Sequence, residues 1–190
     1  MSAAAKSDGR AEDVRSLLQA SLGEAALGPR EARTELAGGP CPVLRPADGG
    51  TLATALRVLA EHRLPALVRG GGTKTPPGAG VGARVVLDTG ALGGVRELDV
   101  DEGVAQVGAG LPLAELAAAL EGSGWEAPLD PPGEAGTVGG ALAAAAVGPR
   151  FGHPRDVVLG LDVALATGER TRCGGRVVKN VTGYDLAKLH

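Results

Sequence analysis

The sequence predicts a globular protein that mixes helices with strands, built as one domain or two small lobes. Hydrophobic residues make up 44% of its 190 residues, which is enough for a packed core. Segment 43–69 reads as strand, helix and strand, at the length of an ordinary β-α-β unit. Further along, short strands follow one another across tight turns, which indicates hairpins.

The first third of the chain predicts an N-terminal helix and the β-α-β unit. Apolar residues from Val14 to Leu22 recur at helical spacing, and Gly23 marks the end of this amphipathic helix. A polar, glycine-containing connection leads to the unit, in which leucines repeat along one helical face before Pro65 ends the helix. The elements expected in the unit are strand 43–45, helix 51–62 and strand 66–69.

The rest of the chain predicts shorter elements separated by glycine and proline. Gly108-Ala109-Gly110 predicts a tight turn rather than a cofactor site, because Leu113 stands where a Rossmann fingerprint has its third glycine; Pro112 stands where a proline is tolerated at a helix start. The alanine-rich run 141–146 predicts a short buried helix packed against backbone. Strands are expected at 84–88, 95–100, 104–107, 157–166 and 171–178, the last two antiparallel, and helices at 113–121 and from Tyr184 onward.

Composition argues against several classes of partner. Nineteen basic and 22 acidic residues give a net charge of −3 with both signs interspersed, and aromatic residues make up only 2%. The chain has neither a basic track nor a stacking platform, so nucleic acid is not expected as a partner. The longest apolar run, 141–147, is too short to cross a bilayer. We expect a cytoplasmic protein without a membrane span, with Cys41 and Cys173 as free thiols.

Three consecutive glycines after strand 66–69 are the strongest functional signal. The backbone N–H groups of loop 70–74 can converge on an anion, and phosphate is the first candidate. The loop does not match a P-loop, because Thr73 precedes Lys74 and Pro76-Pro77 hinder the helix that must follow. The Rossmann fingerprint fails for the same reason. The sequence thus predicts a phosphate-cradling loop with no helix behind it.

A second glycine loop lies at 136–140, at the entrance of the alanine-rich helix. It predicts a second set of exposed N–H groups, and each loop has a threonine beside its glycines. Two such loops far apart in the sequence predict a long ligand held from two lobes, as a dinucleotide would be.

No catalytic constellation stands beside these loops. None of His62, His153 and His190 has a serine or cysteine in a nucleophile context, and a surface or structural imidazole is the favoured interpretation of each. The acidic residues of segment 99–102 suit a solvated hairpin turn better than a metal site. The sequence therefore predicts no metal site and leaves the catalytic residue unknown.

Four segments stand in order along the chain: Arg-Gly-Gly-Gly-Thr-Lys (69–74), Pro-Gly-Glu-Ala-Gly-Thr-Val-Gly-Gly-Ala-Leu (132–142), Gly-Pro-Arg-Phe-Gly-His-Pro-Arg-Asp-Val-Val-Leu-Gly (148–160) and Gly-Gly-Arg-Val-Val-Lys-Asn-Val-Thr-Gly-Tyr-Asp-Leu-Ala-Lys-Leu (174–189). Together they resemble the FAD-binding domain of the vanillyl-alcohol oxidase/p-cresol methylhydroxylase superfamily, from about Val43 to the end. The resemblance implies an α+β fold of two lobes that hold an extended FAD. It also implies a first lobe at 41–110 with the β-α-β unit and a second lobe at 111–190 with a mixed or antiparallel sheet, both following the N-terminal helix and linker at 1–40.

The resemblance also assigns cofactor-binding residues. These residues fall into three groups. The first group forms the pyrophosphate loop, the second lines the other side of the FAD, and the third lies near the flavin. Segment Lys179–Asp185 is a family hallmark and is expected to be structural. No histidine stands in the first glycine loop, where covalently flavinylated relatives carry one, so the FAD is expected to be non-covalent. The three groups are Arg69, Gly70, Gly71, Gly72, Thr73 and Lys74; Gly136, Thr137, Gly139 and Gly140; and Gly152 and Asp156.

Within the superfamily, Ala141 after Gly140 favours the FAD-binding E subunit of glycolate oxidase, close to D-lactate dehydrogenases. That branch implies an oxidoreductase acting on a 2-hydroxy acid, with a catalytic flavoprotein subunit and an iron–sulfur subunit as partners. Two alternatives stay open: a non-catalytic flavin-binding or assembly module, and a UDP-N-acetylenolpyruvoylglucosamine reductase, in which Gly-Thr-Val-Gly-Gly-Ala-Leu also occurs. The segment Lys179–Asp185 argues against the reductase. Family members continue past the final Lys-Leu into a strand and a cap domain, so the chain is expected to be a fragment or a truncated product.

Overall fold

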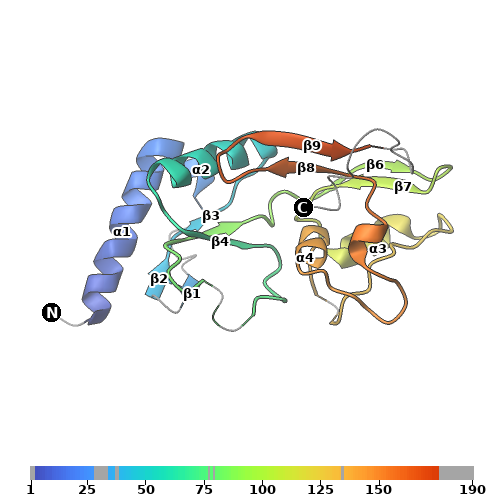
Figure 1. Cartoon of the computed structure of the whole chain (residues 1–190), viewed down its shortest axis with the longest axis horizontal. Helices are drawn as coiled ribbons and strands as arrows, with labels where there is room; N and C mark the ends of the chain where they lie inside the picture. Colours follow the sequence, from blue (N-terminus) through green and yellow to red (C-terminus); the bar gives the residue numbers. More distant parts are fainter. Residues whose placement is uncertain are drawn as a thin grey trace. The chain divides into compact units, whose positions relative to one another are not determined.

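The computed structural model describes residues 3–27, 34–36, 39–76, 78, 80–133 and 135–175 (Figure 1). The expected helix from Tyr184, the end of the expected strand 171–178 and the hallmark Lys179–Asp185 lie outside these residues. The chain divides into two compact units, described separately below. The first consists of Met1–Arg69, Thr75–Ala91 and Ala164–Glu169, and the second of Gly70–Lys74, Leu92–Val163 and Arg170–His190.

A three-stranded parallel sheet forms the centre of the first unit. Its strands are ordered β3 (Val43–Leu44), β5 (Val85–Asp88), β4 (Ala66–Arg69), and α2 (Gly49–Glu61) connects β3 to β4. The β-α-β unit predicted from the sequence is therefore confirmed, although β5 lies between its two strands. Because β5 is the central strand, its consecutive valines and leucine are buried on both faces of the sheet.

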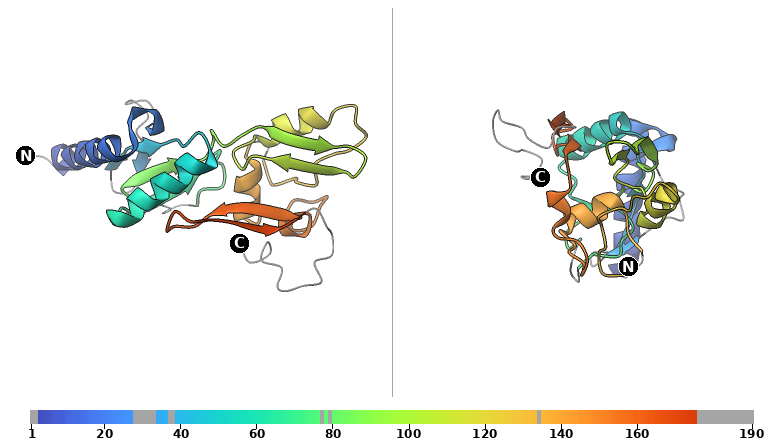
Figure 2. Two further views of the ribbon diagram at one scale, coloured as in Figure 1. Left: turned by 90° about the horizontal axis from the view of Figure 1, so that it is seen from above. Right: turned by 90° about the vertical axis from the view of Figure 1, so that its right-hand side faces the viewer.

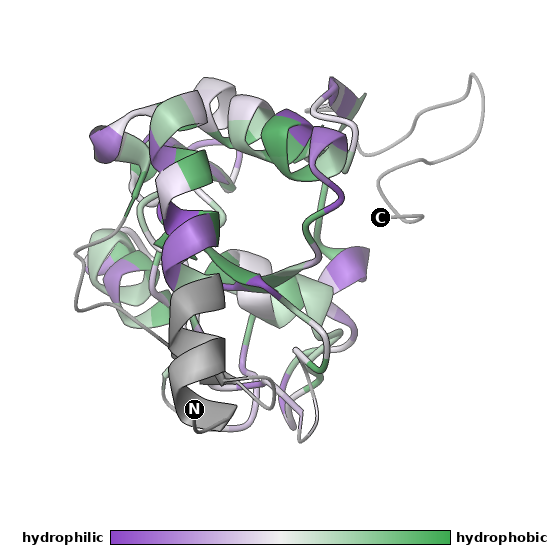
Figure 3. Cartoon of the chain, turned by 90° about the vertical axis from the view of Figure 1, so that its left-hand side faces the viewer, coloured by the Kyte–Doolittle hydropathy of each residue, from purple (hydrophilic) through white to green (hydrophobic). Residues whose placement is uncertain are grey.

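Two helices cover one face of this sheet. Buried side chains of α1 (Ala3–Leu22) and α2 form one hydrophobic cluster with strands β3 and β5. Hydrophobic and hydrophilic residues are interspersed along α2 (Figure 3), as expected of a helix with one side on a core. The fully or nearly buried members of the cluster are Val14, Leu18, Leu27, Leu44, Ala55, Val58, Leu59, Val85 and Leu87.

Both ends of α2 are fixed by local hydrogen bonds. At its start the Asp48 carboxylate accepts the Thr51 N–H at 2.7 Å, so the helix begins slightly before the predicted residue 51. At its end Arg63 has a φ of 50°, and the Leu64 N–H donates to the Leu59 carbonyl at 2.9 Å. This is the Schellman pattern, with arginine where glycine is the usual residue.

The connection between α1 and the sheet has more structure than the sequence predicts. It contains a short 3-10 helix, η1 (Glu24–Ala26), and an antiparallel pair, β1 (Thr34–Leu36) with β2 (Gly39–Cys41). Strands of three residues are too short to show an alternating pattern, so the sequence indicates only a polar connection.

The second unit is built of hairpins and short helices (Figure 2). β6 (Val95–Asp99) and β7 (Val104–Val107) form an antiparallel hairpin with an irregularity near Val95, and α3 (Leu113–Leu120) follows. β8 (Gly160–Ala164) pairs with β9 (Arg170–Gly174), and the turn between them, Ala164–Glu169, belongs to the first unit. The core of the second unit consists of Leu111, Leu116, Leu120 and Val138.

The prediction for the alanine-rich run is only partly confirmed, since Ala141 is buried in a short helix but the later alanines are not. The helix there, α4 (Val138–Ala143), begins before the run and ends inside it. The reason lies at its start, where the Thr137 hydroxyl accepts the Gly140 N–H at 3.2 Å and fixes the first turn. Past Ala143 the chain leaves the helix, and Ala145 has a φ of 45°. Residues 143–145 are exposed, so the run is not a buried helix.

Candidate functional site

The two glycine loops predicted from the sequence lie against each other in the second unit. A Cβ added at Gly71 would lie 3.4 Å from the Gly136 Cα, so the two backbones leave room for little more than a methyl group between them. Nearby, the Lys74 ammonium donates to the Pro132 carbonyl at 3.4 Å. The structure therefore brings loop 70–74 and segment 132–137 together, although they are far apart in the sequence.

Thr137 packs into the space that a side chain at residue 70 would need. A Cβ added at Gly70 would lie only 2.5 Å from the Thr137 Oγ1. The threonine is 6% exposed, and the same oxygen accepts the Gly140 N–H. Glycine at position 70 is thus required by the protein's own packing, independently of any ligand.

The second glycine loop does not supply the exposed donors predicted for it. The Gly139 N–H donates to the Ala109 carbonyl at 2.8 Å, and the Val138 N–H donates to the Leu111 carbonyl at 2.9 Å. With Gly140 bound to Thr137, the first N–H groups of α4 all have partners within the chain. The prediction fails because the turn 108–110 packs against this helix start, and a Cβ at Gly139 would lie 2.8 Å from the Ala109 carbonyl oxygen. Gly139 and Gly140 therefore allow close packing at the start of α4.

The first glycine loop has the opposite character. In the described parts of the chain, no group accepts a hydrogen bond from the N–H groups of residues 70–74. Residues 71–73 are exposed, and Gly72 has a φ of 73°, which favours glycine. Successive N–H groups at a turn, with an ammonium at Lys74, are the kind of donors that bind an anion. A phosphate or pyrophosphate group therefore fits the residues present.

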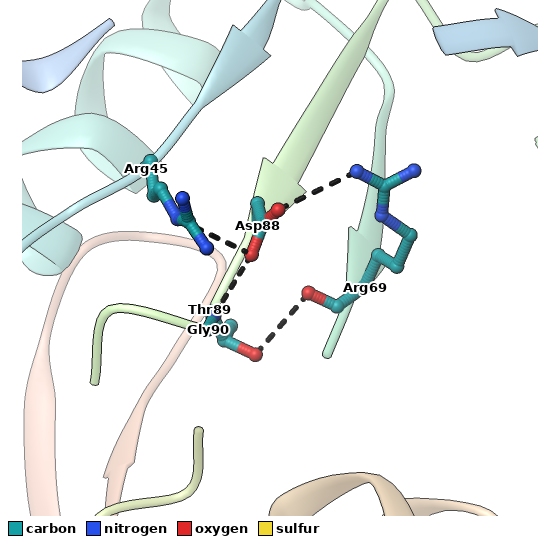
Figure 4. Close-up of polar contacts among 5 residues, drawn as sticks. All are labelled: Arg45, Arg69, Asp88, Thr89 and Gly90. Atoms are coloured by element: carbon teal, nitrogen blue, oxygen red, sulfur yellow. Dashed lines mark hydrogen bonds and ion pairs between the residues drawn. The ribbon is translucent and has the colours of Figure 1, made fainter. Parts of the chain in front are cut away.

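Arg69, the residue before this loop, is held at the carboxyl ends of the parallel strands in the first unit (Figure 4). Its Nη2 donates to the Asp88 Oδ2 at 3.4 Å, and the Nε of Arg45 lies 3.9 Å from the Asp88 Oδ1. The Gly90 N–H donates to the same Oδ1 at 2.8 Å. No sequence motif marks Asp88 as a site residue, although an aspartate that ends a predicted strand two residues before a glycine indicates a polar turn.

Gly152 and Asp156 lie in a different part of the second unit. Gly152 precedes the short 3-10 helix η2 (Pro154–Asp156), which contacts α4 and ends with Asp156, and both residues are exposed. The Asp156 carboxylate is 3.9 Å from its neighbour Arg155, and its N–H donates to the His153 carbonyl at 2.9 Å. Among the described contacts, none joins these residues to loop 70–74. His62 and His153 are both exposed, as the sequence favours.

A cavity of about 590 Å³ lies beside α3 in the second unit and is not predicted from the sequence. Its walls include Trp125 and Phe151 together with apolar side chains of α3. Arg150 lies over the Phe151 ring at 4.9 Å and donates to both carboxylate oxygens of Glu126, at 2.6 and 2.8 Å. Since this carboxylate neutralises the guanidinium, the cavity is a poor anion site compared with loop 70–74.

The described segments show neither a membrane-spanning helix nor a cluster of metal ligands. No helix in the described segments has the length and apolar character needed to cross a bilayer. In the same segments, no three His, Cys, Asp or Glu side chains gather closely enough to hold a metal ion.

Comparison with known proteins places these loops in a family. The model of the FAD binding domain family matches residues 40–174. D-lactate dehydrogenase of Archaeoglobus fulgidus is 36% identical over 151 residues, which cover 77% of this chain and 34% of that protein. Glycolate oxidase subunit GlcE of Escherichia coli is 38% identical over 134 residues, covering 68% and 38%. UDP-N-acetylenolpyruvoylglucosamine reductase of Anaeromyxobacter sp. (strain K) is 35% identical over 183 residues, covering 92% and 50%.

The fold comparison agrees with the family match. A crystal structure of p-cresol methylhydroxylase with substrate bound superimposes with a TM-score of 0.69 at 17% identity, covering 87% of this chain and 36% of that one. The predicted α+β fold of the p-cresol methylhydroxylase type is confirmed. The chain spans between a third and a half of the length of the curated relatives described above. The chain belongs to the FAD binding domain family, and FAD is its cofactor.

Proposed function

We propose that this chain binds FAD through loop 70–74 and forms part of a flavin-linked oxidoreductase that acts on 2-hydroxy acids. The observation that carries the proposal is the set of N–H groups in this loop that no described group accepts, next to Lys74, in a chain of this family. The similarity to a D-lactate dehydrogenase and a glycolate oxidase subunit supports the substrate class. When bound, FAD supplies an acceptor for the hydride or electrons of the substrate.

The glycine loops take different roles in this proposal. Loop 70–74 donates N–H groups to the pyrophosphate, and the Lys74 ammonium offsets part of its charge. Gly136 and Thr137 line the other side, whereas Gly139 and Gly140 fix the start of α4. Non-covalent binding is proposed because loop 70–74 has no histidine. Two points stay predictions. One is that Arg69, Gly152 and Asp156 contact FAD, and the other is that the lobes span 41–110 and 111–190.

The proposed assembly follows the glycolate oxidase relatives. Subunit GlcE and a GlcD protein of Bacillus subtilis are both similar to this chain. We infer a complex with a catalytic flavoprotein subunit and an iron–sulfur subunit, in the cytoplasm. Co-purification of tagged chain from its native host, followed by iron analysis of the complex, tests this inference; recovery of the chain without iron or flavoprotein would contradict it.

The first experiment is a titration of the purified chain with FAD. After removal of free cofactor, bound flavin should absorb near 450 nm, on the order of the wavelength expected of any bound FAD. Inorganic pyrophosphate should compete with FAD, because loop 70–74 binds that part of the cofactor. Absence of bound flavin would contradict FAD binding by this chain, and binding without competition would contradict the role of the loop.

A second experiment separates the enzyme from a non-catalytic module. Glycolate or D-lactate is added under anaerobic conditions to the FAD-loaded chain, alone and with the proposed flavoprotein subunit. Loss of the flavin absorbance in either mixture supports the oxidoreductase. Unchanged absorbance in both supports a binding or assembly module.

A reductase acting on UDP-N-acetylenolpyruvoylglucosamine is the second candidate. The alignment with such a reductase covers 92% of this chain, more than the alignments with the hydroxy-acid relatives cover. The two candidates differ in their ligands, so thermal unfolding of the FAD-loaded chain with each substrate distinguishes them. A stabilisation by UDP-N-acetylenolpyruvoylglucosamine and none by glycolate or D-lactate would favour the reductase.

A further inference from the structure

The glycine loop follows Arg69, which is held by the last residue of the adjacent strand, Asp88, and by the next residue, Thr89. The Arg69 carbonyl accepts hydrogen bonds from the Thr89 N–H at 2.8 Å and from the Thr89 hydroxyl at 3.2 Å. Its guanidinium donates to Asp88, so main chain and side chain of Arg69 are both fixed (Figure 4). The next residue in the chain is Gly70, the first residue of the loop.

Asp88 is itself fixed in place. It pairs in register with Arg69 at the end of the parallel ladder, and its side chain is only 15% exposed. The Gly90 N–H donates to its Oδ1 at 2.8 Å, which sets the orientation of the carboxylate. Arg45 approaches the same oxygen at 3.9 Å from the end of β3. One carboxylate thus connects residues at the carboxyl ends of all three strands.

A loop of three glycines needs such an anchor. Glycine has the greatest backbone freedom of any residue, so the N–H groups of 70–72 would otherwise sample many directions. Binding then has to order the loop, whereas a loop fixed before binding avoids that cost. The hydrogen bonds at Arg69 restrict the backbone and side chain of the residue from which the loop starts.

We propose that Asp88, assisted by Thr89, is a positioning residue for FAD, which fixes Arg69 so that the N–H groups of loop 70–74 converge on the pyrophosphate. Asp88 acts through Arg69 and does not itself touch the cofactor. The proposal rests on the proposed FAD-binding function of loop 70–74. It assigns a role to a residue outside the glycine motifs.

The test compares Asp88→Asn with Asp162→Asn, a matched change at a carboxylate that pairs with Arg172 in the β8–β9 hairpin. For each variant, the dissociation constant of FAD and the inhibition constant of pyrophosphate are measured, together with the melting temperature of the apoprotein. Asp88→Asn should weaken both ligands about tenfold, the usual effect of losing one charge-assisted hydrogen bond, and Asp162→Asn should weaken neither. Equal affinities in Asp88→Asn and wild type would overturn the proposal, even with a lower melting temperature.

Two further variants show whether Asp88 acts through Arg69. Arg69→Met should weaken FAD as much as Asp88→Asn does, and the double variant should be no weaker than either single one. If the losses of FAD affinity in the two single variants added up in the double variant, Asp88 would not act through Arg69. Thr89→Val removes only the hydroxyl donor and should weaken FAD less, and it keeps the test decisive if Asp88→Asn does not fold. A wild-type chain that fails to bind FAD would instead overturn the proposed function itself.

Discussion

Gly70 is the residue of the site with least tolerance for a side chain. The Thr137 Oγ1 cannot withdraw from an added methyl group, because it is buried and caps α4. We expect Gly70→Ala to lower the free energy of unfolding by about 1–3 kcal/mol, the usual range for overpacking. Gly71→Ala is the matched control, since its Cβ would lie at an ordinary 3.4 Å from Gly136. Thermal unfolding of the two apoproteins checks this, and equal losses would contradict it.

Single residues also show how far the sequence predicts the site. Loop 70–74 and Thr137 could be found because glycines with a threonine beside them form a local pattern. The hydrogen bond from the Gly139 N–H could not be predicted, because its acceptor, the Ala109 carbonyl, is distant in sequence and becomes a neighbour only on folding. Asp88 was missed for the same reason, since its importance depends on the pairing of β4 with β5.

The C-terminal end of α2 offers a stabilising substitution. Arg63 adopts the left-handed conformation, with a φ of 50°, which costs a residue with a Cβ more than it costs glycine. We expect Arg63→Gly to raise the free energy of unfolding by about 0.5–1 kcal/mol, after allowance for the greater freedom of glycine in the unfolded chain. Arg57→Gly, within the same helix, should destabilise by about 1 kcal/mol. Chemical denaturation measures both; a destabilised Arg63→Gly would contradict the prediction.

The β8–β9 hairpin predicts a pH dependence. The Arg172 guanidinium donates to both carboxylate oxygens of Asp162, at 2.8 and 3.2 Å, and this hydrogen bonding lowers the pKa of Asp162. Because the folded pKa lies below the unfolded one, the pair stabilises the folded state above the ordinary value of 3.8. That contribution is lost as the pH falls through the lowered pKa.

The effect should be small, because both side chains are exposed to solvent. We expect Asp162→Asn to melt slightly below wild type at about pH 7, and the difference to shrink as the pH is lowered, because the wild-type carboxyl then becomes protonated. Melting curves of both proteins across this range measure it. A difference that persists unchanged at the acid end would contradict the assigned cause.

The elements differ in how well the sequence predicts them. The sequence locates α2 and α3 to within a few residues, because a proline marks the end of the first helix and another the start of the second. The sequence predicts the extent and the burial of the alanine-rich helix wrongly, because alanine favours a helix without indicating which of its sides is buried. Pair β1–β2 was missed because three-residue strands depend on their partner for stability rather than on their own pattern.

At the scale of the molecule, the fold class and family could be predicted from four sequence motifs, whereas the strand order could not. Helices between strands indicate a parallel sheet, but they do not say that β5 inserts between β3 and β4. That order matters for the site, because it places Asp88 beside Arg69.

FAD binding should stabilise the whole chain by mass action. A ligand that binds only the folded state adds about 2.7 kcal/mol to the free energy of unfolding when its free concentration is 100 times its dissociation constant. If loop 70–74 recognises pyrophosphate, ADP should also raise the melting temperature, whereas riboflavin, which has no phosphate, should raise it much less. Thermal unfolding at increasing concentrations of each ligand measures the three effects. Riboflavin as effective as FAD would place recognition on the flavin ring and contradict the role of the loop.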